Sequence, residues 1–204
     1  MELALIRHAE PRRAAGADER RDPGLSDAGR AQAERIAARL AGERWDALYS
    51  SPQRRALETA EIVSARLALP VQVEEGLAEF DRGAEYLHVE DAAADDERLL
   101  AFRREDFSAY GTDAATIRRN ARTALEAIVA ANPGRRVAVI SHGAVINAYV
   151  GSVIGVERLV FHRPAYTGMT RLLISRQGVG SLQSLNESAH LCMPQPRTAQ
   201  PREA

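Results

Sequence analysis

Short apolar runs alternate with longer segments of helical periodicity along most of the chain. The runs at 2–7, 47–50 and 137–140 have the length and composition of buried β-strands. Between them, apolar residues recur every three or four positions, as in helices that pack one face against a sheet. This alternation predicts helices at about 26–42, 51–69, 113–131 and 143–155, and further strands at 71–73, 168–175 and 181–185.

The order strand, loop, helix occurs at least three times, which predicts an α/β fold. We expect a three-layer αβα sandwich with a mostly parallel central sheet and helices on both faces. Two helix starts have recognisable caps. Ser26 precedes the first helix, and Ser51 precedes Pro52, which favours Ser51 as the N-cap of the second helix with proline in its first position.

Residues 81–112 have no regular pattern apart from one short helix at about 98–104, and they carry more acidic residues than arginines. Irregular segments of this length are usually functional. We therefore predict a single domain over residues 1–191, in which 81–112 form a lid or specificity insertion. The Pro-rich, polar residues 192–204 are predicted to be a disordered tail.

Composition narrows the function classes. Of the 204 residues, 45% are hydrophobic, which is enough for a core, and the formal net charge of −1 gives no support to nucleic-acid binding. No apolar run reaches the roughly 20 residues of a membrane helix, and the first residues lack the pattern of a signal peptide, so we expect a cytoplasmic protein without membrane association. Cys192 is the only cysteine, which excludes an internal disulfide and a two-cysteine metal motif.

Three predicted strands end in reactive side chains. Arg7-His8 follows the first, the segment from Ser51 to Arg55 follows the second, and Ser141-His142-Gly143 follows the strand at 137–140. The carboxyl ends of parallel strands lie at one edge of a sheet, where α/β proteins bind ligands. Arginine forks match phosphate oxygens, and helix N-termini favour anions. The pooled side chains therefore predict a phosphate site. Read alone, an Arg-His pair such as Arg7-His8 is more often a surface feature than a catalytic one.

The ordered set of motifs resembles the histidine phosphatase superfamily, also called the phosphoglycerate mutase-like family. The resemblance covers residues 3 to about 191. The motifs that carry it are Arg7-His8-Ala9, Leu25-Ser26-Asp27-Ala28-Gly29-Arg30-Ala31-Gln32-Ala33, Ser50-Ser51-Pro52-Gln53-Arg54-Arg55-Ala56 followed by Glu58-Thr59-Ala60, Leu77-Ala78-Glu79, Ser141-His142-Gly143, and the stretch from Leu185 to Leu191.

This resemblance implies a role for each matched residue. His8 would be the nucleophile that takes the phosphoryl group, and Glu79 the general acid, with Asp81 or Glu85 close enough in sequence to compete for that role. The phosphate oxygens would be held by Arg7, Arg55 and His142. No metal or other cofactor is expected, because arginine and histidine supply the positive charge. Five further arginines are candidates for the substrate rim: Arg12, Arg13, Arg20, Arg21 and Arg54.

The resemblance implies a metal-independent phosphomonoester hydrolase that works through a phosphohistidine on a small phosphorylated substrate. A phosphoglycerate mutase type of phosphoryl transfer is the alternative within the family, and a catalytically weak member that binds a phosphorylated ligand is the alternative outside catalysis. Many members carry an Asn several residues after the nucleophile, and this chain has Pro11-Arg12-Arg13-Ala14-Ala15 there. This departure weakens the mutase alternative. The sequence leaves the oligomeric state open, with a homodimer as one option.

Overall fold

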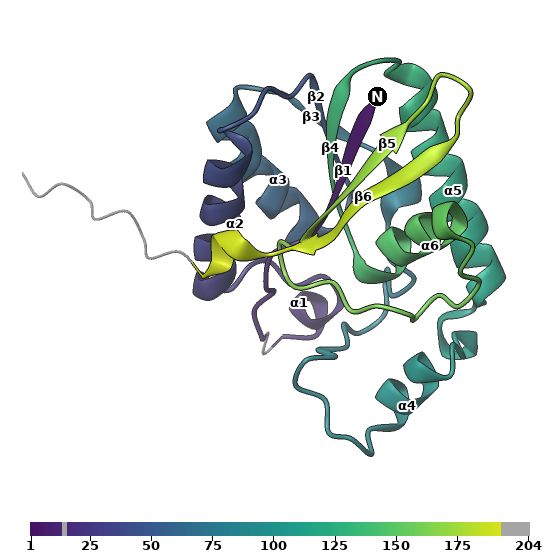
Figure 1. Cartoon of the computed structure of the whole chain (residues 1–204). Helices are drawn as coiled ribbons and strands as arrows, with labels where there is room; N and C mark the ends of the chain where they lie inside the picture. The colour runs from purple at the N-terminus through teal and green to yellow at the C-terminus, as the bar shows by residue number, and fades with distance from the viewer. Residues whose placement is uncertain (14–15, 193–204) are drawn as a thin grey trace, which may run out of the picture.

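The computed structural model describes residues 1–13 and 16–192, in which six strands form one sheet flanked by helices (Figure 1). The strands are β1 (Glu2–Arg7), β2 (Ala47–Ser50), β3 (Val71–Val73), β4 (Arg136–Ser141), β5 (Met169–Ile174) and β6 (Gly180–Glu187). The helices are α1 (Ala17–Arg21), α2 (Asp27–Leu40), α3 (Arg54–Leu67), α4 (Glu97–Arg103), α5 (Ala114–Ala131) and α6 (Gly143–Ile154). Short 3-10 turns lie at η1 (Glu75–Leu77), η2 (Ser108–Tyr110) and η3 (Ala189–Leu191).

The sheet has the strand order β3-β2-β4-β1-β5-β6. Strands β3, β2, β4 and β1 pair parallel with one another, while β5 pairs antiparallel with β1 and β6 antiparallel with β5. The predicted α/β sandwich with a mostly parallel sheet is confirmed. Because β4 lies between β1 and β2, the carboxyl ends of the three strands with reactive termini are adjacent.

Each face of the sheet carries its own hydrophobic core. On one face, α2 and α3 pack through residues such as Ile36 and Val63, and on the other, α5 and α6 pack through residues such as Leu125 and Ile146. Successive residues of β1 alternate between the two cores, as strand geometry requires. The strand that ends at the predicted nucleophile is thus covered on both faces.

Helix α2 starts as predicted: the Ser26 side chain caps it, accepting a hydrogen bond of 2.9 Å from the backbone N–H of Gly29. The start predicted for α3 is wrong, because the helix begins at Arg54 with Gln53 as its N-cap. Ser51 remains in the strand pairing, since its N–H donates to the carbonyl of Ile140 (3.0 Å), and its hydroxyl is engaged by His142.

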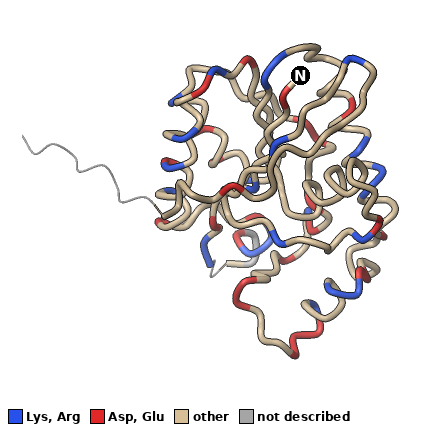
Figure 2. Tube along the Cα trace, viewed as in Figure 1, with Lys and Arg blue, Asp and Glu red and all other residues tan. Residues whose placement is uncertain are grey.

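Two segments outside the long helices contain short ones. The loop 10–24 includes α1, and the segment 81–112 contains α4, shifted by one residue from the predicted helix, together with η2. In Figure 1 both segments lie beyond the carboxyl end of β1. Figure 2 shows acidic residues along the chain that leads into α4, in agreement with the acidic bias of the sequence.

Phe80 joins the segment 81–112 to the core: its ring centroid lies 4.7 Å from that of Phe107 and 4.9 Å from that of Tyr110. Apart from Cys192, the predicted tail lies outside the described residues. Among the residues that the structure describes, no helix is both long and apolar enough to cross a membrane.

Candidate active site

The sheet register brings the three predicted strand ends together. Arg7 of β1 lies beside Ser141 of β4, and Ser50 of β2 lies beside Ile140 of β4. The backbone N–H of His8 donates to the carbonyl of Ser141 over 2.8 Å. The loops after these strands therefore start at fixed positions relative to one another, and their side chains meet at one edge.

The start of α2 holds the loop that carries His8, the predicted nucleophile. The backbone N–H of Glu10 donates to the Gln32 side chain (2.9 Å), and the carbonyl of Glu10 accepts from the N–H of Ser26 (3.0 Å). A Cβ on Gly29 would lie 2.0 Å from that carbonyl oxygen, so only glycine allows the approach. Helix α3 holds the same loop as well, because the N–H of Ala9 donates to the Thr59 hydroxyl (3.0 Å). These contacts give a structural reason for Ser26, Gly29 and Gln32 in the motif that spans Leu25 to Ala33.

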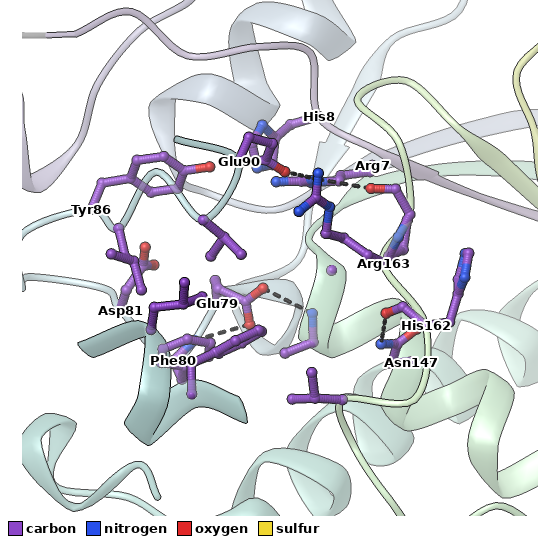
Figure 3. A pocket seen from close by; sticks show the side chains of 18 of the residues that line it. Arg7, His8, Glu79, Phe80, Asp81, Tyr86, Glu90, Asn147, His162 and Arg163 are labelled. Carbon is purple, nitrogen blue, oxygen red and sulfur yellow. Dashed lines mark hydrogen bonds and ion pairs between the residues drawn. The ribbon is translucent and has the colours of Figure 1, made fainter. Parts of the chain in front are cut away.

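A cavity of about 350 Å³ opens at this edge of the sheet (Figure 3). Its polar end is formed by Arg7, His8, Arg55, Glu79, Asp81, Tyr86 and Glu90, and its apolar wall includes Phe80, Leu87, Val89, Leu99, Phe102, Val160 and Phe161. The apolar wall comes mainly from the segment 81–112 and from the chain between α6 and β5. Figure 3 shows that the Arg163 side chain also reaches into the cavity.

His8 lies almost fully buried at the polar end, with 2% of its surface exposed. Its Nδ1 lies 2.8 Å from the carbonyl oxygen of Ala9, and because a carbonyl can only accept, Nδ1 carries the proton. Burial, together with the charges of Arg55 and Arg7, lowers the pKa of His8 well below 6.5. The ring is therefore neutral, and its Nε2 has a free lone pair.

His142 lies beside His8, with 5.1 Å between the ring centroids. Its Nε2 makes a 2.7 Å hydrogen bond with the Ser51 hydroxyl, and its buried Nδ1 has no hydrogen-bond partner within the described residues. Burial and the charge of Arg55 lower the pKa of His142 well below its usual value, so this ring is also neutral. Nδ1 is therefore the ring nitrogen through which the predicted contact with phosphate would be made.

Each of the two predicted phosphate-binding arginines is already paired with a carboxylate. The Arg55 Nη2 atom lies 2.9 Å from Asp81, and the Arg7 Nη1 atom lies 2.7 Å from Glu90. Both carboxylates belong to the segment 81–112. Neither Arg7 Nε nor Arg55 Nε and Nη1 has a hydrogen-bond partner in the part of the chain that the structure describes. Donors of both guanidinium groups thus remain for an anion.

Glu79 faces the cavity from the turn after η1. Its carboxylate accepts hydrogen bonds from the backbone N–H of Ala144 (3.0 Å), at the N-terminus of α6, and from that of Phe80 (3.3 Å). Burial and the nearby charge of Asp81 raise the pKa of Glu79 to about 7, although these hydrogen bonds act in the opposite direction. Glu79 can therefore carry a proton near neutral pH.

The two sequence alternatives to Glu79 are placed differently. Asp81 is held in its ion pair with Arg55 and accepts a further hydrogen bond of 2.9 Å from the Gln53 side chain. Glu85 is exposed, pairs with Arg20 at 3.2 Å and lines a separate cleft. Of the three carboxyl groups, Glu79 is the one that lines the main cavity and is not held in an ion pair with an arginine.

The predicted rim arginines do not line the main cavity. Arg12, Arg13 and Arg20 line a second cleft of about 170 Å³, in which Glu85, Tyr86 and His88 also take part. Arg12 pairs with Glu19, and Arg13 pairs with Asp91 at 2.6 Å. Arg54 is exposed and pairs with Glu58 at 2.8 Å, and Arg21 is exposed at the end of α1. Their contact with substrate stays a prediction.

Sequence reasoning missed three residues of this site, namely Tyr86, Tyr166 and Glu90. The two tyrosine rings lie 6.2 and 5.7 Å from the His8 ring, measured between centroids. Glu90 accepts hydrogen bonds from Arg7 and from the Tyr166 hydroxyl, the latter over 2.7 Å. All three lie in irregular segments, where no periodicity or motif indicated their position.

Within residues 1–13 and 16–192, no group of three or more His, Cys, Asp or Glu side chains is arranged so that it could hold a metal ion. The positive charge at the site comes from arginine. Independence from a metal stays a prediction that chelation can test.

The model of the histidine phosphatase superfamily (branch 1) matches residues 3–188. The chain belongs to the histidine phosphatase superfamily. The family resemblance of the sequence motifs is thereby confirmed. Phosphoglycerate mutase-like protein 4 of Arabidopsis thaliana is 32% identical over 160 residues, which cover 72% of this chain and 68% of the plant protein.

Solved structures of the superfamily share the fold. Phosphoserine phosphatase from Entamoeba histolytica, in complex with 3-phosphoglyceric acid, is 25% identical, with 93% of this chain and 98% of that chain covered and a TM-score of 0.72. A mycobacterial glucosyl-3-phosphoglycerate phosphatase, in complex with VO3, is also 25% identical, with 92% and 99% covered and a TM-score of 0.72. Two of the proteins that this chain resembles are thus named as phosphatases.

Proposed function

We propose that this member of the histidine phosphatase superfamily hydrolyses phosphate monoesters through a phosphohistidine at His8, without a metal. One observation carries the proposal: a neutral His8, with its Nε2 free, shares one cavity with Arg7, Arg55 and Glu79. The phosphatases among the structural relatives support a hydrolase.

In the first step, His8 Nε2 attacks the phosphorus atom. An N–P bond forms while the ester P–O bond breaks, and Glu79 gives its proton to the departing alkoxide oxygen. Arg7 and Arg55 stabilise the charge on the transferred phosphoryl oxygens. His142, through Nδ1, supplies a further hydrogen bond. The products of this step are the free alcohol, phosphohistidine and the Glu79 carboxylate.

In the second step, water replaces the alcohol. The Glu79 carboxylate takes a proton from the water as its oxygen attacks phosphorus, and the N–P bond to His8 breaks. Phosphate leaves, and both His8 and Glu79 return to their starting protonation states. Glu79 thus acts first as acid and then as base.

The test is the replacement His8→Ala. We expect release of phosphate from an aryl phosphate to fall to background, because covalent transfer has no acceptor. Intact-protein mass spectrometry after a rapid acid-free quench should show a phosphoryl adduct on the wild type and none on the variant. Activity that survives in the variant, with its circular dichroism unchanged, would reject His8 as nucleophile.

Two controls separate the alternatives. Wild-type activity should persist in excess chelator, since no metal takes part. With 3-phosphoglycerate as substrate, the appearance of free phosphate indicates a hydrolase, whereas the appearance of 2-phosphoglycerate without free phosphate would indicate the mutase alternative. Phosphate binding without turnover of any ester would indicate the ligand-binding alternative.

A further inference from the structure

Two phenol side chains cover the nucleophile and stack on the two arginines of the site. The guanidinium carbon of Arg55 lies 4.5 Å from the centroid of the Tyr86 ring, and that of Arg7 lies 4.1 Å from the centroid of the Tyr166 ring. Tyr86 is buried, with 9% of its surface exposed, and Tyr166 is half-buried. The rings thus hold the guanidinium planes beside His8, and the hydroxyl groups lie close to each other.

The hydrogen bonds of these hydroxyls have a defined direction. Tyr166 has one proton, and it donates that proton to Glu90 Oε2 over 2.7 Å. In the contact between the two hydroxyls, which are 3.5 Å apart, Tyr86 must therefore be the donor. A separation of 3.5 Å lies beyond the normal range for O–H···O bonds. The Tyr86 proton is thus weakly engaged and free to turn to a better acceptor.

The Tyr86 hydroxyl points toward the position expected for a phosphoryl oxygen of the substrate. Tyr86 lines the same cavity as His8, Arg7 and Arg55, and Figure 3 shows its hydroxyl pointing to the side where His8 and Glu90 lie. A phosphoryl group attacked by His8 would occupy the space between these side chains. Burial raises the pKa of Tyr86, which keeps the phenol protonated and hence a donor.

We propose that Tyr86 is a further substrate-binding residue, whose hydroxyl donates a hydrogen bond to an oxygen of the transferred phosphoryl group. The inference rests on the proposed function and extends it to a residue outside the motifs. Since Arg7 and Arg55 each give one donor group to a carboxylate, a neutral hydroxyl adds a donor to the site without adding charge. This contact is to the phosphoryl group, so it serves every ester regardless of its alcohol.

The variant Tyr86→Phe tests the proposal, because phenylalanine keeps the ring that stacks on Arg55 and removes only the hydroxyl. We expect kcat/KM to fall by roughly 10- to 100-fold, and by the same factor for an aryl and an alkyl phosphate. Orthovanadate, which mimics the five-coordinate transition state, should lose affinity by a similar factor. Tyr149→Phe, in the core under α6, is the matched control and should leave both quantities unchanged.

Three results would overturn the inference. An unchanged kcat/KM together with an unchanged inhibition constant for orthovanadate means that the hydroxyl does not touch the phosphoryl group. A loss confined to one class of ester means that it contacts the alcohol instead. A lower melting temperature with unchanged orthovanadate affinity means that its role is structural. Failure of the proposed function is separate: it appears as activity in His8→Ala, whereas orthovanadate binding to Tyr86→Phe can be measured calorimetrically without turnover.

Discussion

At the residue scale, burial acts on His8 and Glu79 in a way that suits phosphoryl transfer. Removal from water disfavours the charged form of any titratable group. It lowers the pKa of His8, so the imidazole is neutral, and it raises the pKa of Glu79 to about 7, so the carboxyl can carry a proton near neutral pH. The charges of Arg55 and Arg7 reinforce the first effect, and that of Asp81 reinforces the second.

These shifts predict the pH dependence of the reaction. For an alkyl phosphate, kcat/KM should decline above pH 7, because the free enzyme then loses the Glu79 proton that the leaving alkoxide needs. No decline from His8 is expected down to pH 6.5, since its pKa lies well below that value. Glu79→Gln should lower kcat/KM for the alkyl ester by roughly 10²- to 10⁴-fold. It should also remove the decline near pH 7.

The comparison of the wild type with Glu79→Gln provides the control, because ionisation of the substrate affects the pH profiles of both proteins equally. An aryl phosphate, whose phenolate leaves more readily, should lose less activity in Glu79→Gln. A variant that retains the decline near pH 7 would show that another group is the acid, and Asp81 would then be the first to examine.

The sequence predicted the residues at strand ends far better than those in loops. Arg7 ends β1 and His142 follows β4, so the pairing of these two neighbouring strands brings both residues to one edge, where the His142 ring lies 5.1 Å from that of His8. Tyr86 and Glu90 reach the same cavity from an irregular segment, whose path is determined by packing against distant residues. No local pattern encodes such a path, which is why these residues were missed.

At the element scale, the segment 81–112 does more than form a wall of the cavity. Its first part carries both carboxylates that pair with the arginines, Asp81 on Arg55 and Glu90 on Arg7. Burial alone would raise the pKa of Glu90, but the charge of Arg7 and hydrogen bonds from Arg7 and Tyr166 outweigh it and lower the pKa. Glu90 is therefore an anion that forms an ion pair with Arg7 in the absence of substrate.

This arrangement predicts that Glu90 competes with phosphate. In Glu90→Gln, the amide oxygen can still accept from Arg7, but the negative charge is gone. We expect inorganic phosphate to inhibit the variant with an inhibition constant roughly three- to tenfold lower than that of the wild type, a change of up to about 1.4 kcal/mol. Competitive inhibition of aryl phosphate hydrolysis measures this constant directly.

Asp91→Asn is the matched control, because it removes the same charge one residue away, from a carboxylate paired with the exposed Arg13. Its effect should be small, since water and salt screen exposed charges. Weaker inhibition by phosphate in Glu90→Gln would contradict competition and would mean that Glu90 holds Arg7 in its binding orientation.

Element boundaries were predictable only where local chemistry determined them. Ser26 caps α2 as its sequence indicates, because its hydroxyl oxygen can accept from the N–H of Gly29 while its proton is donated to the Glu10 carboxylate (2.9 Å). Ser51 has the same local signal before Pro52, yet it does not cap α3. Its hydroxyl bonds to His142, which lies 91 positions away, and this long-range contact outweighs the local preference.

At the scale of the whole molecule, His8 directly follows β1, a strand whose residues contribute to two hydrophobic cores. Leu3 and Leu5 of β1 belong to the core under α5 and α6, while Ala4 and Ile6 belong to the core under α2 and α3. The α/β class was predictable because continuous apolar strands such as 137–140 require helices on both sides. The antiparallel β5 and β6 at one edge follow from the short turn between them.

The two cores predict additive effects on stability. Ile36 of α2 and Leu125 of α5 are both fully buried, on opposite faces of the sheet. Replacing either with alanine removes buried methyl groups and leaves a cavity, so each variant should lose roughly 2–5 kcal/mol of the free energy of unfolding. Because the sites share no neighbours, the double variant should lose the sum to within about 0.5 kcal/mol.

Urea denaturation of the wild type, the two single variants and the double variant measures these free energies. The unfolding is followed by circular dichroism and by tryptophan fluorescence. Both signals should change in one transition, since β1 and β4 contribute to both cores and neither core can open without exposing the other face of the same strands. A coupling energy well above 0.5 kcal/mol would mean that the sheet transmits strain between its faces. Two separate transitions would mean that the helical layers unfold independently, and His8 would then be held by only one of them.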